Sequence, residues 1–187
     1  MPTAEAVARY LLHLAAATPE PSLITQMQLH KLLYYAHGWC LATQKRPLFP
    51  ARFQAWTHGP VEANVYPVFA DYEARAIAPH EARDDDGLSK QDRGIIESVW
   101  LGYGKFSAWH LREMTHKEPP WKQARRSQPL DVASKAPITD ESMRKYFESL
   151  QDANCRRFGF SAAELAESLE EIRRGATTEL VLPQRGA

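Results

Sequence analysis

The chain has 187 residues, of which 44% are hydrophobic and 25% are charged, as in an average soluble globular protein. Its 23 basic and 23 acidic residues cancel, which argues against a polybasic nucleic-acid-binding protein and against a disordered acidic tail. A chain of this length forms one domain with its own hydrophobic core and leaves room for an appendage.

Targeting signals and disulfides are not expected. The charged residues Glu5 and Arg9 interrupt the first apolar stretch, so the N-terminus does not have the pattern of a signal peptide. No run of 18 apolar residues is present that would predict a membrane span. Cys40 and Cys155 are too far apart in sequence to suggest a disulfide framework. A reducing cytoplasm is therefore the predicted location.

Helical periodicity dominates the N-terminal part of the chain. Thr3 is predicted to cap a first helix, which two prolines in the segment 18–22 bring to an end. Thr25 is predicted to cap a second helix, with Gln28 three residues later as in a capping box. This second helix, which runs to about Ala42, is apolar over most of its circumference, so we expect it at the centre of the domain.

A small β element is expected after the second helix. Residues 52–57 alternate between apolar and polar side chains and predict a short strand, with Trp56 on the polar face. Gly59 and Pro60 predict the start of a helix, because proline suits the first helical position. Residues 75–80 are predicted to form the partner strand.

The second half of the chain predicts helices again. A short helix is expected from Trp121, after two prolines, and residues 127–137 are expected to form a loop. Side chains that can cap four further helices are Ser89, Ser107, Thr139 and Ser161.

These elements predict a mainly α fold. We expect a compact multi-helix domain over residues 1–151, with a small two- or three-stranded β element, and a C-terminal helical extension with a frayed tail over residues 152–187. The apolar stripe of the helix predicted over Ser161–Arg173 is narrow, which favours a dispensable or partner-facing extension.

No metal or cofactor site is predicted. His30 and His37 lie two helical turns apart, roughly 10 Å along the axis, and so are not expected to share one ion. Cys40, three residues after His37, lies in the most apolar helix, where burial would raise the pKa of its thiol and leave it inert.

Catalytic motifs such as Gly-x-Ser-x-Gly and the glycine-rich phosphate loops are absent from the sequence. The chain is therefore predicted not to be an enzyme. His58 and His116 both lie in connections between helices, where functional residues concentrate. A metal-free, nuclease- or hydrolase-like enzyme that uses these two histidines as acid and base stays open as an alternative.

A DNA-binding autorepressor is a further alternative. The start of the second helix superficially resembles a recognition helix, with exposed positions at Gln26, Gln28, His30 and Lys31. No cluster of arginines accompanies them to bind phosphates, so a core helix is the preferred interpretation and nucleic acid is not the predicted partner.

The five tryptophans are many for this length, and most of them are expected in the core. Trp56 and Trp109 are the two that we predict to be partly exposed. An exposed tryptophan beside a short strand suits protein recognition. The alternative for both is a packed ring whose N–H binds a loop carbonyl.

Several motifs occur in a characteristic order. They are Leu29-His-Lys-Leu-Leu-Tyr-Tyr-Ala-His-Gly-Trp-Cys-Leu-Ala42, Pro47-Leu-Phe49, His58-Gly-Pro-Val61, and Thr115-His116 followed by Pro120-Trp121. The chain resembles the Panacea (SocA-like) antitoxin domain in this order, from about the first helix to near Leu150. It departs from the pattern at Lys45–Arg46, where a glycine often precedes Pro-Leu-Phe.

The resemblance implies a mainly helical domain that is encoded in toxin–antitoxin pairs on phages, mobile elements and chromosomes. Such a domain neutralises a cognate protein toxin, usually by direct contact, and some members have been linked to delivery of the toxin to an ATP-dependent protease. It also implies that Leu29, Leu32, Tyr34 and Trp39 lie in the core with Lys31 beside them, that Gly59 and Pro60 start a helix, and that His116 and Trp121 form a second junction.

A cytoplasmic antitoxin that acts by binding is therefore the leading prediction, with no catalytic residues. The toxin is expected to bind through the surface around Trp56, His58 and Tyr66. Trp109, His116 and Trp121 are expected nearby.

Overall fold

The computed structural model describes residues 1–18, 23–84, 87–126 and 128–158, with side chains as far as Asp152. It divides into two units, Met1–Phe147 and Glu148–Ala187, and the candidate site residues lie in the first. The elements are α1 (Ala4–Ala16), α2 (Gln26–Gln44), β1 (Phe53–Trp56), β2 (Gly59–Glu62), the 3-10 helices η1 (Tyr66–Tyr72) and η2 (Pro79–Glu81), α3 (Lys90–Tyr103), α4 (Ala108–Lys117), α5 (Pro119–Arg125) and α6 (Asp140–Phe158).

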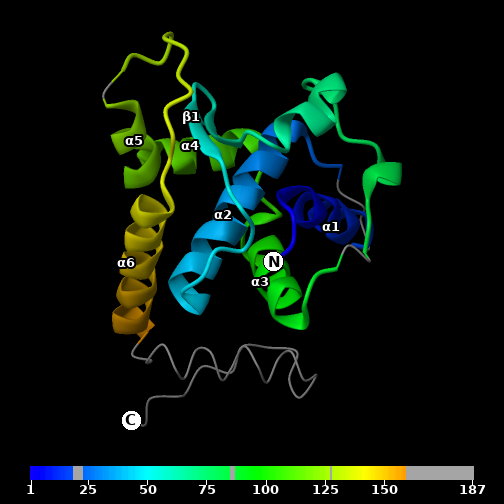
Figure 1. Ribbon diagram of the computed structural model, residues 1–187, viewed down its shortest axis with the longest axis horizontal. Coiled ribbons are helices and arrows are strands. Elements are labelled where there is room, and N and C mark those ends of the chain that lie inside the picture. Colours follow the sequence, from blue (N-terminus) through cyan, green and yellow to red (C-terminus); the bar gives the residue numbers. More distant parts are fainter. Residues whose placement is uncertain (19–22, 85–86, 127, 159–187) are drawn as a thin grey trace. The chain divides into compact units, whose positions relative to one another are not determined.

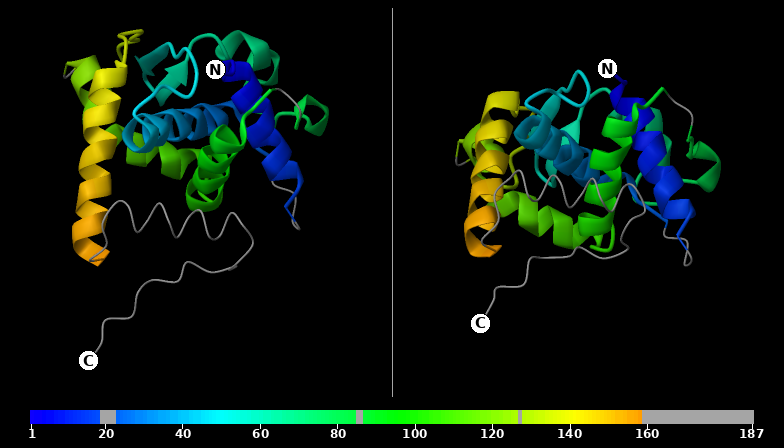
Figure 2. Two further views of the ribbon diagram at one scale, coloured as in Figure 1. Left: turned by 60° about the horizontal axis from the view of Figure 1, so that its bottom comes forward. Right: turned by 90° about the horizontal axis from the view of Figure 1, so that it is seen from below.

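The predicted mainly helical fold with a small β element is confirmed over the described residues. Helix α2 is the central element, since it contacts α1, α3, α4, β2 and η1 (Figure 1). Fifteen of its 19 residues are buried, as its all-round apolar pattern predicts. Helices α1 and α3 also contact each other (Figure 2).

The predicted core residues lie mostly where expected. Leu29, Leu32 and Tyr34 are fully buried on α2. Trp39 is half-buried, and its indole N–H donates to the hydroxyl of Tyr103 at 3.1 Å. Among the described residues, no helix is both long and apolar enough to cross a bilayer.

Side-chain caps start the N-terminal helices as predicted. Thr3 and Thr25 each accept a hydrogen bond from the backbone N–H three residues later, at 3.1 and 3.3 Å. The capping box predicted at Gln28 is not formed. The amide of Gln28 donates instead to the carbonyls of Gly104 and Phe106, at 3.3 and 3.0 Å, and so joins α2 to the α3–α4 connection.

Later helix starts follow the same rule. Ser89, Ser107 and Thr139 accept hydrogen bonds from backbone amides at the starts of α3, α4 and α6. Helix α5 begins at Pro119, two residues before the predicted start, because prolines fit the first helical turn. The helix predicted over Ser161–Arg173 lies outside the described residues.

The β element differs from the prediction. Gly59 and Pro60 do not start a helix; they begin β2, which pairs antiparallel with β1 so that Pro60 lies opposite Ala55. The N–H of Ala55 points away from β2 and donates to the carbonyl of Ala136 at 2.8 Å, so Ala55 and Pro60 are a pair without hydrogen bonds between them. The missing N–H of Pro60 therefore removes no hydrogen bond of the hairpin. The strand predicted over 75–80 is also wrong, because only an isolated bridge at Ala76 is present there.

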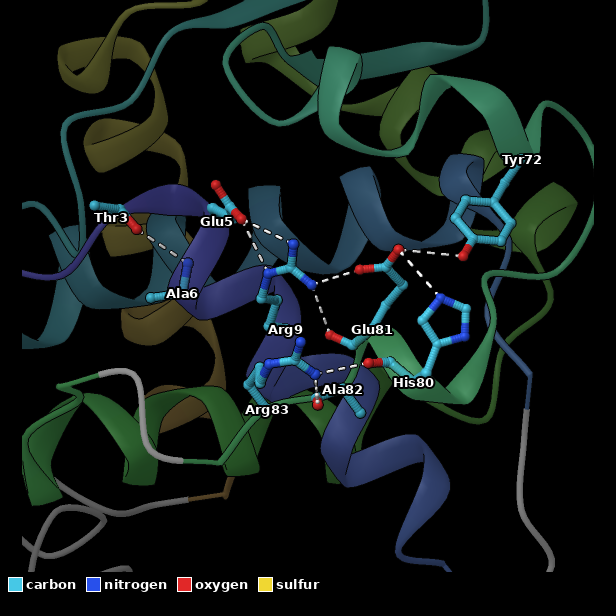
Figure 3. Close-up of polar contacts among 9 residues, drawn as sticks. All are labelled: Thr3, Glu5, Ala6, Arg9, Tyr72, His80, Glu81, Ala82 and Arg83. Atoms are coloured by element: carbon cyan, nitrogen blue, oxygen red, sulfur yellow. Dashed lines mark hydrogen bonds and ion pairs between the residues drawn. The ribbon is translucent and has the colours of Figure 1, made fainter.

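Polar contacts fix η2 to α1 (Figure 3). The guanidinium of Arg9 binds the Glu81 carboxylate at 2.5 Å, and it also bonds Glu5 one turn earlier on α1. The hydroxyl of Tyr72 donates to the other oxygen of Glu81 at 3.2 Å. These contacts hold the segment that follows η1 in place, and no functional residue predicted from the sequence takes part in them.

Candidate functional site

Four of the predicted partner-binding side chains surround the tight turn between β1 and β2. We call Trp56, His58, Tyr66 and Trp109 the hairpin-turn surface. The rings of Trp56 and Tyr66 lie 4.7 Å apart, and those of His58 and Trp109 lie 6.0 Å apart. Trp109 is 60% exposed, Tyr66 is 37% exposed and Trp56 is half-buried. The predicted partial exposure of Trp56 and Trp109 is therefore confirmed. Trp39 and Trp100 are half-buried too, and only Trp121 of the five tryptophans is buried, so the expectation that most of them lie in the core is wrong.

The turn beneath this surface is held by three side chains from α2 and α5. The indole N–H of Trp121 donates to the carbonyl of Trp56 at 3.0 Å. Lys31 Nζ donates to the carbonyl of Pro60 at 3.2 Å, and a guanidinium nitrogen of Arg125 donates to that of Ala55 at 3.3 Å. A turn held in this way loses little conformational entropy when a partner binds.

Trp121 lies below this surface, whereas His116 is half-buried beside it. Their rings stack at 4.0 Å with an interplanar angle of 11°, and Trp121 is only 5% exposed. The alternative stated for Trp56 and Trp109 was a packed ring whose N–H binds a backbone carbonyl. That arrangement is found at Trp121 instead. The N–H of Trp56 binds the side-chain oxygen of Gln54 at 2.8 Å.

A buried carboxylate positions Tyr66. Glu62, which is completely buried at the end of β2, accepts backbone N–H bonds from Arg52, Asn64 and Val65 at 2.7 to 2.9 Å. These bonds fix the loop that leads into η1, where Tyr66 is the first residue. Sequence reasoning missed Glu62, because a single glutamate after an apolar strand carries no signal of burial.

Arg112 was also missed. Its guanidinium lies over the ring of Trp109, 5.1 Å from the centroid, and its Nε donates to Nδ1 of His58 at 3.3 Å. It forms an ion pair with Glu113. The spacing of three residues between Trp109 and Arg112 on a predicted helix was the available signal, since such residues share a face.

The residues proposed to face DNA in a recognition helix are buried. Gln26, Gln28, His30 and Lys31 are each at most 8% exposed, so they cannot contact base edges from these positions. Burial, and then the positive charge of Arg112, lower the pKa of Lys31 to about 7. The recognition-helix interpretation is therefore wrong for this segment.

The electrostatics of the two histidines do not suit an acid–base pair. Burial, and then the charge of Arg112, lower the pKa of His116 to about 4. The same causes lower the pKa of His58. Both imidazoles are therefore neutral at pH 7, whereas a general acid must carry a proton at the working pH.

Burial raises the pKa of the Cys40 thiol to about 11, as predicted. The thiol therefore stays protonated at neutral pH and is a poor nucleophile. Within the described residues, no group of three or more His, Cys, Asp or Glu side chains is placed to hold a metal ion.

The fold and the surface define a class: a mainly helical domain that presents rigidly held aromatic side chains. The model of the family described as "Antitoxin SocA-like, Panacea domain" matches residues 29–122, a range that includes the whole hairpin-turn surface. Antitoxin SocA of Caulobacter vibrioides (strain NA1000 / CB15N) is 38% identical over 129 residues, which cover 63% of this chain and 68% of the relative. No solved structure matches the chain. The chain belongs to the SocA-like Panacea antitoxin family.

Proposed function

We propose that this protein neutralises a cognate toxin by direct contact through the hairpin-turn surface. The observation that carries the proposal is the 38% identity with an antitoxin over 129 residues. Neutralisation by binding requires affinity and no turnover, so the domain needs a surface that is shaped before the toxin arrives. The three donors that hold the turn support this.

The chemistry of the surface favours a protein partner. Trp109 projects most of its ring into solvent, and Tyr66 exposes more than a third of its area. Tryptophan and tyrosine dominate the energetic hot spots of protein interfaces. Trp121 supports the surface from below, so its contribution to toxin binding is indirect, and His116 stacks on it.

The proposal includes three further points. The protein acts in the cytoplasm without a metal, cofactor or catalytic residue. Its antitoxin domain comprises residues 1–151, with residues 152–187 as an extension. The protein also delivers the bound toxin to an ATP-dependent protease. This step predicts that the half-life of the toxin shortens when this protein is present.

Co-expression with the product of the neighbouring gene tests the proposal. We expect growth to be rescued and a complex to elute from size exclusion. Trp109→Ala should abolish rescue, whereas Leu101→Ala, which removes another exposed side chain (77%) on α3, should not. Failure of the natural chain both to rescue growth and to form a complex would contradict the proposal.

A double variant distinguishes the binding proposal from the alternative that the protein is an enzyme. Replacement of both His58 and His116 by alanine removes the two acid–base candidates that the sequence analysis named. If the protein acts by binding, neutralisation persists at saturating expression. Complete loss of neutralisation, with a folded variant that still binds the toxin, would favour the enzyme.

A further inference from the structure

Charge is distributed unevenly over the chain. Residues 105–135, which include α4 and α5, contain seven basic and three acidic side chains. Residues 71–97, which include η2 and the start of α3, contain four basic and eight acidic side chains. Trp109 belongs to the basic part, as do Trp121 and Arg125, whose side chains hold the turn.

One of the three acidic residues in the basic part, Glu118, does little to neutralise it. Glu118 is 6% exposed, and the hydroxyl of Tyr35 donates to it at 2.8 Å. Burial raises the pKa of Glu118 to about 7, which reduces its negative charge. Lys31 is 1% exposed beneath the turn and among the described residues no carboxylate bonds it, but its pKa of about 7 leaves it only partly charged at neutral pH.

Arg112 is the cation best placed to meet a partner. Its side chain is 14% exposed and is held between Trp109 and His58, so much of its desolvation has already occurred. Glu113, its ion-pair partner and neighbour in sequence, has a side chain that is 57% exposed. A pair with such an exposed carboxylate is weak, so another carboxylate can replace Glu113 at small cost.

We propose that the toxin surface which docks on the hairpin-turn surface is acidic and places a carboxylate against Arg112, in exchange for Glu113. The inference rests on the proposed function and specifies the chemistry of its partner. A planar guanidinium binds a carboxylate through two parallel hydrogen bonds, and the ring of Trp109 fixes its plane. The surrounding positive charge accelerates the encounter with an acidic partner.

A protein is favoured over nucleic acid as the acidic partner. Trp109, Tyr66 and Val132 expose 60%, 37% and 44% of their areas on or near the basic part, which suits a protein interface better than a row of phosphates. The buried Gln26 and Lys31 leave the start of α2 without groove-facing side chains.

The association rate of the purified protein with the co-purified neighbouring toxin, measured by stopped flow at low and high salt, tests this inference. Arg112→Gln should lower the rate about fivefold at low salt, and Glu113→Gln should raise it, because the competing carboxylate is lost. Arg112→Lys keeps the charge and should retain most of the rate. Arg83→Gln removes one exposed charge beside η2 and should change nothing.

Two results would overturn the inference while leaving the proposed function intact. One is a complex whose rate is independent of salt and of both Arg112→Gln and Glu113→Gln. The other is that Arg112→Gln instead weakens operator DNA binding or self-association, which would assign the basic part to nucleic acid or to a second copy of the chain. No complex with the toxin at all would contradict the proposed function and this inference together.

Discussion

Lys45 ends α2 in the left-handed region, with φ 55°. An L-residue with a Cβ pays an energetic cost there, which glycine avoids, and the family pattern often has a glycine near this position. Lys45→Gly should therefore raise the free energy of unfolding by up to about 1 kcal/mol, measured by urea denaturation. A decrease would show that the lysine side chain contributes more than the strained backbone costs.

Glu118 should make stability depend on pH. Burial raises its pKa from 4.5 to about 7 in the folded state. The unfolded chain therefore ionises first as pH rises, and the group's contribution, fully present below pH about 4.5, is lost by pH about 7. Relative to Glu118→Gln, the natural protein should lose up to about 3 kcal/mol of unfolding free energy across this window.

A second variant checks the cause of this pH dependence. The hydroxyl of Tyr35 donates to Glu118 and opposes the rise in its pKa. Tyr35→Phe should therefore move the upper end of the window to higher pH in chemical denaturation series. Identical pH profiles for the natural protein and Glu118→Gln would contradict the account.

At the scale of elements, the hairpin depends on the close approach of its turn to α2 and α4. Gly59 has φ +97°, and a Cβ there would lie 2.5 Å from Cε of Lys31 and 2.8 Å from Oγ1 of Thr115. Gly59→Ala should cost about 2–4 kcal/mol of unfolding free energy, by thermal or urea denaturation.

A matched glycine separates backbone strain from the clash. Gly87 has φ +70°, and an added Cβ would meet no atom within 4 Å in the part of the chain that the structure describes. Gly87→Ala should therefore cost only about 1 kcal/mol. Equal costs at Gly59 and Gly87 would show that the turn does not press against Lys31 and Thr115.

The sequence predicts most elements because their signals are local. Ser89 and Ser107 cap helices through bonds to residues three positions away, and the alternation around Trp56 predicts β1. Strand β2 is missed because Gly59-Pro60 is equally compatible with a helix start. The segment is a strand because it pairs with β1, and on its other side β1 bonds Ala136 through Ala55. The bond between Ala55 and Ala136 joins residues far apart in sequence, so local patterns do not show it.

In the candidate site, too, features set by local sequence could be predicted and features set by distant residues could not. The exposure of Trp56 and Trp109 could be predicted from position in a strand and a helix. The burial of Lys31 could not, because a lysine at a capped helix start is usually exposed and its acceptor is the distant carbonyl of Pro60. Arg112 acquires its role from the position of His58, 54 residues away.

For the whole molecule, the proposed domain boundary makes a direct prediction. Truncation after Asp152 should leave a folded protein, because the described core lies in Met1–Phe147. We expect the melting temperature of the truncated chain, measured by circular dichroism, to stay within about 4 °C of that of the full chain. Loss of cooperative unfolding would show that the extension belongs to the core.

The central claim is that the protein acts by binding a toxin through the hairpin-turn surface, and the dissociation constant of that complex tests it most directly. By calorimetry, Trp109→Ala should weaken binding by about 2 kcal/mol or more, roughly 30-fold, as expected for a tryptophan hot spot. Leu101→Ala should leave the constant unchanged. Equal, small effects of the two substitutions on a tight complex would contradict the account.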